Sequence, residues 1–369
     1  MHEARLARLL QLLQQASLDG LAVIAGPNLL YLSGVSFHLM ERPVVALFLR
    51  DAEPALVLPA FEQSKGEASP IPFRLFPYEE DEDSRASAFR AAAVHVGLAE
   101  RRLGVEPLRM RFLEFGLLQQ AEPKAVLVGA ESVVTELRLT KDEVELAAMR
   151  RAVEVAEQAL QLALPQIRQG MTERELAGEL TLQMLRAGSD SELPFPPIVA
   201  SGPNSALPHH VPGDRPLQAG DLLILDWGAT VAGYISDLTR TFFLPPLDPE
   251  LERIHQLVLL ANAAGRAAVH PGASCASVDQ AARAVITAQG YGPEFRHRTG
   301  HGIGMEAHEP PYIRDDNAQL LQPGMTFTIE PGVYLTGRGG VRIEDNVLVT
   351  PDGCECLSSL PRELQDVGS

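Results

Sequence analysis

The 369 residues, 46% hydrophobic and 21% charged, have the composition of an ordinary globular protein long enough for two domains. A formal net charge of −17 argues against nucleic acid or an anionic membrane as a partner, because the densest basic stretch, residues 101–111, is short. Three cysteines without a paired zinc-type spacing favour a reducing, cytoplasmic setting; Cys354 and Cys356 are interpreted as free thiols, with metal or redox binding as the alternative.

The first third of the chain predicts a small α/β domain over residues 1–130. It opens with an amphipathic helix that places Leu6, Leu9 and Leu13 on one face. This helix is not interpreted as a signal peptide, and no apolar run approaches the ~20 residues that a membrane span needs. Further on, we expect strands at 21–25, 44–49, 55–58, 74–76 and 103–105 and a helix at 85–98.

A second domain is expected over residues 131–369. A long helical pattern at 136–163 includes the capping-box spelling Thr140-Lys-Asp-Glu143. We expect further helices at 173–187, 249–269 and 278–289, and strands at 222–226, 236–244, 325–330 and 340–350. These elements lack the regular alternation of a doubly wound parallel sheet, so the sequence predicts an α+β fold.

Two strand pairs of the second domain each carry two carboxylates. If the turn after the first strand is centred near Val231 and Ala232, Asp226 lies directly across from Asp237, with the two Cβ atoms ~5 Å apart. A turn centred on Gly337 places Glu330 opposite Glu344 in the same way. Both pairs therefore bring like charges together within apolar β sequence.

This opposition of like charges needs compensation, because both the repulsion and the burial of carboxylates are destabilising. Arg240 and Arg342 can satisfy only part of four carboxylates, so divalent cations are the expected compensation. The alternative is that the acids are solvated strand residues that face each other by accident. The recurrence of the pattern in two hairpins favours the metal site.

A glycine-rich segment between the two hairpins carries His297, His301 and His308 within twelve positions. Its glycines allow a close approach of the backbone, and a neutral imidazole from His301 can complete a metal site. Four carboxylates and one imidazole form an oxygen-rich ligand set, which favours Mn(II), Co(II) or Fe(II) over a thiolate-type zinc. The segment alone is a weak motif, because a lone histidine is more often an ordinary core or surface residue.

A turn-rich segment at 200–210 ends in His209 and His210 and leads into the first acidic strand. Neither histidine has metal-ligand spacing to the other. One of them is a candidate proton donor at the mouth of the site, and an ordinary surface turn is the alternative.

Taken together, these segments resemble the pita-bread metallopeptidases, the family of methionine aminopeptidase, Xaa-Pro aminopeptidase (aminopeptidase P) and Xaa-Pro dipeptidase (prolidase). The resemblance covers roughly residues 131–369, and the order Asp, Asp, His, Glu, Glu is specific to it. It implies two divalent metal ions per chain, with Mn(II) expected and Co(II), Fe(II) or Zn(II) as alternatives. Its five metal ligands correspond to Asp226, Asp237, His301, Glu330 and Glu344.

The same resemblance assigns roles to neighbouring residues. His209, seventeen positions before the first ligand, and His308 correspond to the catalytic histidines, and His297 corresponds to a substrate-pocket histidine. Arg342 lies two residues before Glu344 and corresponds to an arginine that helps order the metal site. Some prolidases carry an arginine four residues after the second catalytic histidine, where this chain has Tyr312, and this departure weakens the dipeptidase interpretation.

The N-terminal domain resembles the creatinase-type domain of the proline-specific branch, on the segment Asn28-Leu-Leu-Tyr-Leu-Ser-Gly34. Methionine aminopeptidases usually lack such a domain. Creatinase shares the fold without the metal ligands, so its activity is not expected here. A loop of the N-terminal domain offers Arg42 as an anchor for a substrate carboxylate, with a solvated loop charge as the alternative.

The resemblance implies hydrolysis of Xaa-Pro bonds in dipeptides, with Xaa-Pro aminopeptidase activity on longer peptides as the alternative. The tertiary Xaa-Pro amide needs a pocket shaped for its ring. We expect a water bridging two metals about 3.5–4 Å apart to attack as hydroxide, with Glu330 taking its proton and His308 stabilising the oxyanion. From a different class, a non-catalytic peptide-binding module usually loses ligands that this chain keeps. A homodimer is implied by resemblance alone.

Overall fold

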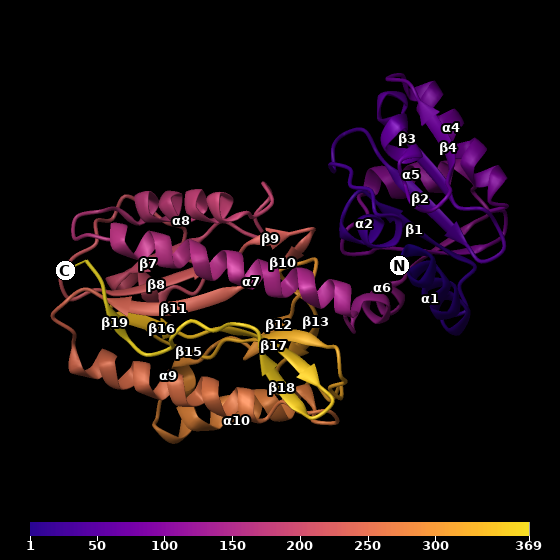
Figure 1. Cartoon of the computed structure of the whole chain (residues 1–369). Coiled ribbons are helices and arrows are strands. Elements are labelled where there is room, and N and C mark those ends of the chain that lie inside the picture. Colours follow the sequence, from indigo (N-terminus) through magenta and orange to yellow (C-terminus); the bar gives the residue numbers. More distant parts are fainter. Residues whose placement is uncertain (369) are drawn as a thin grey trace. The chain divides into compact units, whose positions relative to one another are not determined.

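The computed structural model describes residues 1–368 and divides into two compact units, Met1–Arg138 and Leu139–Ser369 (Figure 1). The division comes eight residues after the boundary that the sequence suggests. The reason is that helix α6 (Glu131–Arg138) packs against α1 (His2–Gln15). In addition, Nη1 of Arg138 donates a buried hydrogen bond of 2.8 Å to the Asn28 side chain, which ties the end of α6 to the first unit.

The N-terminal unit is built on one mixed, six-stranded sheet in the order β4-β3-β2-β1-β5-β6. Its central strand β1 runs antiparallel to β2 and parallel to β5. Both β1 and β2 are buried along their whole length, so their sequences are continuously apolar. The strands are β1 (Gly20–Ile24), β2 (Val45–Leu49), β3 (Ala55–Pro59), β4 (Arg74–Tyr78), β5 (Arg102–Val105) and β6 (Val126–Gly129).

The sequence predicts five of these strands and two of the helices of this unit. The predicted helix at 85–98 is α4 (Glu82–His95). Strand β6 has no counterpart among the sequence predictions, and neither have the helices α2 (Pro27–Ser33), α3 (Gln63–Glu67) and α5 (Phe112–Ala121). The unit is the small α/β domain that the composition of the segment indicates.

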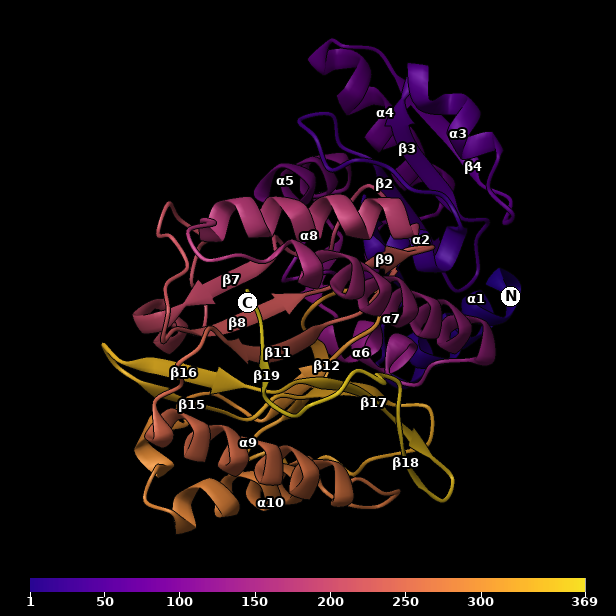
Figure 2. The same ribbon diagram turned by 60° about the vertical axis from the view of Figure 1, so that its left-hand side comes forward.

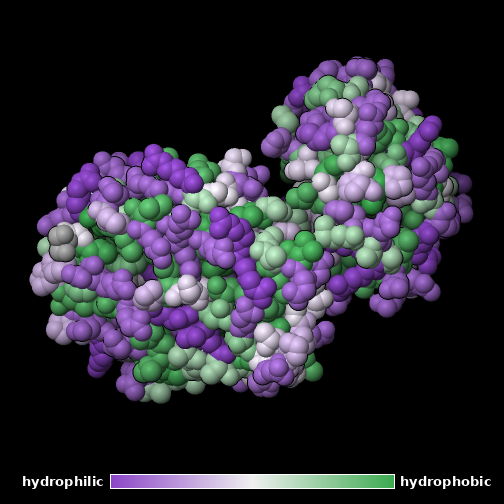
Figure 3. Space-filling view, in the orientation of Figure 1, coloured by the Kyte–Doolittle hydropathy of each residue, from purple (hydrophilic) through white to green (hydrophobic). Residues whose placement is uncertain are grey.

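The C-terminal unit places its strands between two pairs of helices (Figures 1 and 2). Helices α7 (Glu143–Ala163) and α8 (Glu173–Ala187) lie on one side, and α9 (Pro249–Ala267) and α10 (Cys275–Ala288) on the other. Helix α8 buries Leu176, Leu180 and Met184 at a spacing of four residues. Its outer surface is largely hydrophilic (Figure 3). Segregated helices over antiparallel strands confirm the α+β prediction.

The predicted helix at 136–163 is two helices, α6 and α7, separated by Leu139–Asp142. Thr140 does not cap a helix, because its backbone forms an antiparallel bridge with Met325. Asp142 is the N-cap instead. Its side chain accepts from the backbone N–H groups of Val144 and Glu145, and the Glu145 carboxylate accepts from the backbone N–H of Asp142. The capping box therefore lies two residues later than its sequence signature suggests.

Two sheets carry the residues that matter for the site. A four-stranded sheet has the order β19-β11-β8-β7, and a five-stranded sheet has the order β13-β12-β14-β17-β18. The first contains β7 (Ile198–Ser201), β8 (Leu222–Trp227), β11 (Leu238–Phe243) and β19 (Gln365–Asp366). The second contains β12 (Gly300–Gly302), β13 (Glu309–Ile313), β14 (Thr326–Ile329), β17 (Asp345–Thr350) and β18 (Gly353–Cys356).

None of the helices within residues 1–368 has the length and apolar character needed to cross a bilayer.

Candidate metal centre

The first acidic hairpin joins β8 to β11 through the short strands β9 (Thr230–Val231) and β10 (Tyr234–Ile235). Asp226 faces Thr239 in this ladder, so the predicted direct opposition of Asp226 and Asp237 is wrong. The turn is centred on Ala232 and Gly233, both with positive φ (51° and 78°), one residue later than predicted. The resulting shift of two residues leaves Asp226 and Asp237 as diagonal neighbours on one face.

The second acidic hairpin follows the predicted register. Strands β15 (Gly332–Leu335) and β16 (Gly339–Arg342) pair symmetrically about Gly337, and β14 and β17 continue the same register beyond them. Ile329 faces Asp345 on one side, and Gly332 faces Arg342 on the other. Glu330 therefore falls opposite Glu344, between the two ladders.

The two hairpins meet at Thr239. Its backbone forms an antiparallel bridge with Glu344, and its hydroxyl donates a 2.6 Å hydrogen bond to Oε2 of Glu344. Two residues before Glu344, at the end of β16, Arg342 donates to Oδ2 of Asp226 at 2.6 Å and to the Thr239 hydroxyl at 3.1 Å. Asp226, Thr239 and Glu344 thus form one row across the hairpins, although 118 positions separate its ends in the sequence.

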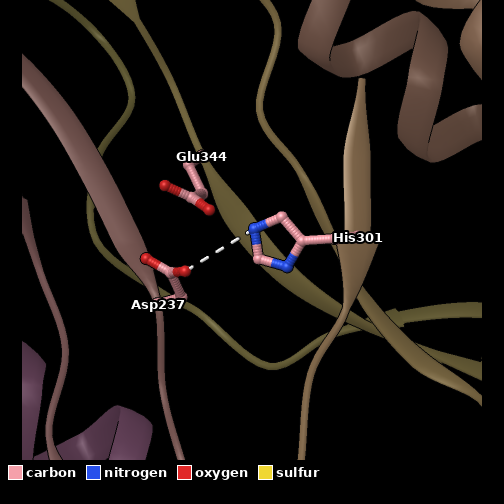
Figure 4. A group of neighbouring side chains, drawn as sticks. All are labelled: Asp237, His301 and Glu344. Carbon is pink, nitrogen blue, oxygen red and sulfur yellow. Dashed lines mark ion pairs between the residues drawn. The ribbon is translucent and has the colours of Figure 1, made fainter. Parts of the chain in front are cut away.

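His301 faces the acids from β12, and Asp237, His301 and Glu344 point toward one another (Figure 4). Ligand atoms of these three residues all lie within 4.8 Å of one another. Nδ1 of His301 lies 3.2 Å from the carbonyl oxygen of Gly302, so Nδ1 carries the proton and Nε2 presents a lone pair. That lone pair faces Glu330 Oε1 at 3.3 Å and Asp237 Oδ2 at 3.8 Å.

Burial governs the protonation of this cluster. It raises the pKa of Asp237 well above its ordinary value, and the charges of Glu344, Asp226 and Glu330 raise it further. Burial and the neighbouring acids likewise raise the pKa of Glu344, and burial raises that of Glu330 to about 7. The pKa of His301 is held well below its ordinary value by burial, so its imidazole is neutral.

A separate structural observation indicates that these residues can bind divalent cations. Oδ1 of Asp226 is buried and has no hydrogen-bond partner within residues 1–368, although its sister oxygen is held by Arg342. A buried oxygen without a partner is costly, and so is a lone pair on His301 directed at carboxylates. A cation among them satisfies both, and the oxygen-rich donor set suits a hard divalent ion.

A pocket of about 670 Å³ opens onto the acids, and His209, His297 and His308 line it. The ring of His308 lies beside that of His301, with 4.1 Å between centroids. Nδ1 of His297 donates to the carbonyl oxygen of Arg298 at 2.7 Å, so Nε2 accepts from the Tyr334 hydroxyl at 2.9 Å. Burial lowers the pKa of His297 to about 4, consistent with a neutral ring.

The model of metallopeptidase family M24 matches residues 147–351, and the model of the creatinase/prolidase N-terminal domain matches residues 5–140. Together they span both compact units. The chain belongs to metallopeptidase family M24.

Individual M24 relatives extend over the whole chain. An Xaa-Pro dipeptidase of Pyrococcus horikoshii is 31% identical over 98% of this chain and 98% of its own length. The structure of a prolidase from Thermococcus sibiricus has a TM-score of 0.95 at 31% identity, covering 100% of this chain and 99% of that one. An X-Pro aminopeptidase from Thermotoga maritima has a TM-score of 0.87 at 30% identity, covering 98% of this chain and 99% of that one. These relatives confirm a creatinase-like N-terminal domain followed by a pita-bread domain.

Two residues that the sequence suggests as substrate contacts, Tyr312 and Arg42, have partners within their own units of this M24 chain. Tyr312 faces His301 across the β12–β13 ladder, where the Arg298 guanidinium lies over its ring at 4.6 Å. Arg42 belongs to the N-terminal unit, where it pairs with Glu80 at 2.8 Å and with Glu41 at 2.5 Å. Its charge is therefore shared between two carboxylates.

Two further residues at the candidate site, Tyr334 and Arg298, are not predicted from the sequence. Tyr334 links Arg342 to His297, because Nη1 of Arg342 donates to its hydroxyl at 3.0 Å. Arg298 lines the pocket three residues before His301. Their only sequence signal is proximity to a ligand, since Tyr334 lies four residues after Glu330.

Proposed function

We propose that the chain hydrolyses Xaa-Pro dipeptides as a prolidase, with two divalent metal ions held by Asp226, Asp237, His301, Glu330 and Glu344. The observation that carries the proposal is the convergence of four carboxylates, three buried and that of Glu330 partly buried, and one neutral imidazole at the floor of a pocket. Its volume, about 670 Å³, suits a small ligand. The names of the Pyrococcus and Thermococcus relatives agree with this assignment, and the name of the Thermotoga relative agrees with the aminopeptidase alternative.

The metal ions are proposed to be Mn(II), with Co(II), Fe(II) or Zn(II) as alternatives, because the donor set is dominated by carboxylate oxygens. When bound, they supply Lewis-acid polarisation of the scissile carbonyl and lower the pKa of a water molecule. Arg342 donates a hydrogen bond to Asp226, and Thr239 donates one to Glu344. Both carboxylates are therefore oriented by the protein without a bound ion.

Glu330 is the proposed proton acceptor. Its side chain is partly exposed to the pocket, and its raised pKa of about 7 suits proton transfer near neutral pH. In this scheme it takes the proton of the attacking water and holds it for delivery to the leaving group. Thr328 assists by placing its hydroxyl 3.3 Å from Oε1 of Glu330.

The pocket histidines act on the substrate in this proposal. His308 and His209 are both exposed and both line the pocket, so their imidazoles are accessible to a peptide. His308 donates to the oxygen of the scissile carbonyl as negative charge develops there. His209 assists proton delivery to the proline nitrogen. His297, fixed between Arg298 and Tyr334, shapes the wall of the pocket.

Apolar side chains of the pocket suit a proline ring. Phe195, Pro196 and Ile198 line it beside the histidines. A ring packed on these residues leaves the tertiary amide facing the acids. Tyr312 and Arg42 remain proposed contacts for the far end of the substrate, with Arg42 as the anchor of a dipeptide carboxylate.

The choice between dipeptidase and aminopeptidase is tested by comparing kcat/KM for Ala-Pro and Ala-Pro-Ala with Mn(II)-loaded protein. We expect a preference for Ala-Pro, because a dipeptide presents its carboxylate next to the scissile bond. A preference for Ala-Pro-Ala would assign aminopeptidase P activity instead. The homodimer and the cytoplasmic location stay predictions, which light scattering and cell fractionation would check.

A further inference from the structure

A fully buried carboxylate lies outside the candidate metal centre, at the first residue of α8. Glu173 is 0% exposed, and its two oxygens accept five hydrogen bonds. The donors are Ser201 N at 2.9 Å, Ser201 Oγ at 2.7 Å, Asn204 Nδ2 at 3.0 Å, His210 Nε2 at 2.7 Å and Gly213 N at 3.2 Å. Every donor belongs to residues 201–213, the segment that carries His209.

This arrangement keeps the Glu173 carboxylate charged. Burial acts to raise its pKa, but hydrogen bonds from Asn204, Ser201 and His210 outweigh burial and hold the pKa below its ordinary value. Hydrogen bonds to an ionised acceptor are about twice as strong as neutral ones. The charged Glu173 carboxylate therefore holds this segment in addition to the strand pairing of Ser201 and the 3₁₀ helix Gly202–Ala206.

The hydrogen bonds to Glu173 give the two adjacent histidines different roles. The ring of His210 is committed to Glu173 through Nε2. The backbone N–H of His210 closes a turn onto the carbonyl of Leu207 at 3.1 Å, and His209 lies within that turn. The side chain of His209 is exposed and lines the pocket. Fixing His210 therefore fixes the end of the turn that presents His209.

A buried carboxylate also holds the segment that carries a second pocket histidine, His297. Asp279 of α10 is 0% exposed and accepts from the Thr299 backbone N–H at 3.0 Å and the Thr299 hydroxyl at 2.7 Å. It also binds Arg283, which donates to the carbonyl oxygen of His297 at 2.8 Å. In both cases a buried helical carboxylate holds an irregular segment that carries a pocket histidine.

We propose that Glu173 is a positioning residue that, through His210, orients His209 toward the substrate. This inference rests on the proposed function, because it takes a role of His209 in turnover as given. Glu173 contacts neither substrate nor metal. It acts by limiting the conformations of residues 207–213, so its removal misplaces His209 without removing a reacting group.

The test compares Glu173→Gln with Glu175→Gln in the Mn(II)-loaded full chain. A glutamine keeps the shape of Glu173 but turns one of its two acceptor atoms into a donor, which opposes the N–H donors around it. We expect kcat for Ala-Pro to fall about tenfold to a hundredfold with KM nearly unchanged, since misplacement of an ångström costs about a hundredfold. Glu175 lies in the same first helical turn but is exposed and caps Thr172, so its variant should keep kcat.

A double-mutant cycle separates positioning from damage to the fold. In a His209→Ala background, Glu173→Gln should cause no further loss of kcat, because the group it positions is absent. His210→Gln, which retains an N–H donor for Glu173, should keep more activity than His210→Ala. Independent, multiplicative losses in the cycle would overturn the proposal, as would wild-type kcat in Glu173→Gln.

The outcome for the wild-type protein distinguishes the two levels of inference. If folded, metal-loaded wild type cleaves neither Ala-Pro nor Ala-Pro-Ala, the proposed function is overturned and the role of Glu173 with it. If wild type cleaves Ala-Pro and Glu173→Gln matches it in kcat, only the positioning role is overturned.

Discussion

Nη2 of Arg342 donates to Oδ2 of Asp226 at 2.6 Å, while Oδ1 of the same carboxylate has no hydrogen-bond partner within residues 1–368. One oxygen is thus fixed by the protein, and the other is left for a cation. The orientation of this carboxylate depends on a residue 116 positions away in the sequence.

Arg342→Met should therefore weaken metal binding. Loss of a residue that orients a metal ligand typically costs about tenfold to a hundredfold in affinity, and here it also leaves Asp226 buried without its ion pair. Titration of the metal-free protein with Mn(II) measures the effect. Arg338→Met is the matched control, because Arg338 lies on the same hairpin but pairs with Asp248 and Glu250 at the surface. Equal affinities in the two variants would contradict the prediction.

Glu330→Gln should abolish most turnover while the fold survives. Removal of a general base typically costs about a hundredfold to ten-thousandfold, and the substitution also removes a proposed metal ligand. The melting temperature of the metal-free variant at pH 8 should not fall, because a neutral amide relieves repulsion with Asp226. Near-normal hydrolysis of Ala-Pro by this variant would refute the role of Glu330.

Removal of metal should inactivate the protein, and Mn(II) or Co(II) should restore it. The physical reason is that the acids alone offer neither a Lewis acid nor a water of lowered pKa. Activity on Ala-Pro is measured before and after dialysis against chelator, with metal content of about two ions per chain expected on reloading. Unchanged activity after exhaustive dialysis would exclude a metal mechanism.

The contribution of Glu330 to the stability of the metal-free protein should fall as the pH rises from about 4.3 to about 7. The folded pKa of Glu330, about 7, lies above its unfolded value of about 4.3, so the folded state binds the extra proton and loses that advantage through this window. Melting temperatures of the wild type and of Glu330→Gln at pH 5 and pH 8, with and without Mn(II), measure the effect. The stabilisation by metal should be larger at pH 8, and a larger shift at pH 5 would contradict the argument.

The buried ion pair between Lys141 and Glu309 should matter more than an exposed pair. Its atoms lie 2.8 Å apart, with side-chain exposures of 1% and 7%. Glu309→Gln leaves a buried ammonium without its carboxylate and should cost about 3–5 kcal/mol. The exposed pair Arg151–Glu154 provides the control, since Glu154→Gln should cost at most about 1 kcal/mol. Equal unfolding midpoints in denaturant for the two variants would contradict the prediction.

Local signals predicted much of the fold and part of the site. Hydrophobic periodicity located α8 to the residue and most of the other predicted helices and strands to within a few positions. Gly337, with φ of 78°, set the register of the second hairpin, because a central glycine permits a tight turn there. The sequence places the turn of the first hairpin one residue too early. The reason is that Ala232 adopts a positive φ, which an alanine rarely does and which the sequence therefore does not indicate.

The sequence by itself singled out the acids and histidines proposed to carry the chemistry, because alternation along a strand predicts which side chains share a face. Only the tertiary structure decided how these residues act together. The bridge between Thr239 and Glu344, the ion pair of Arg342 with Asp226 and the five bonds to Glu173 join segments 28 to 116 positions apart. Such contacts follow from chain packing, which places distant segments side by side, and no local pattern of residues encodes them.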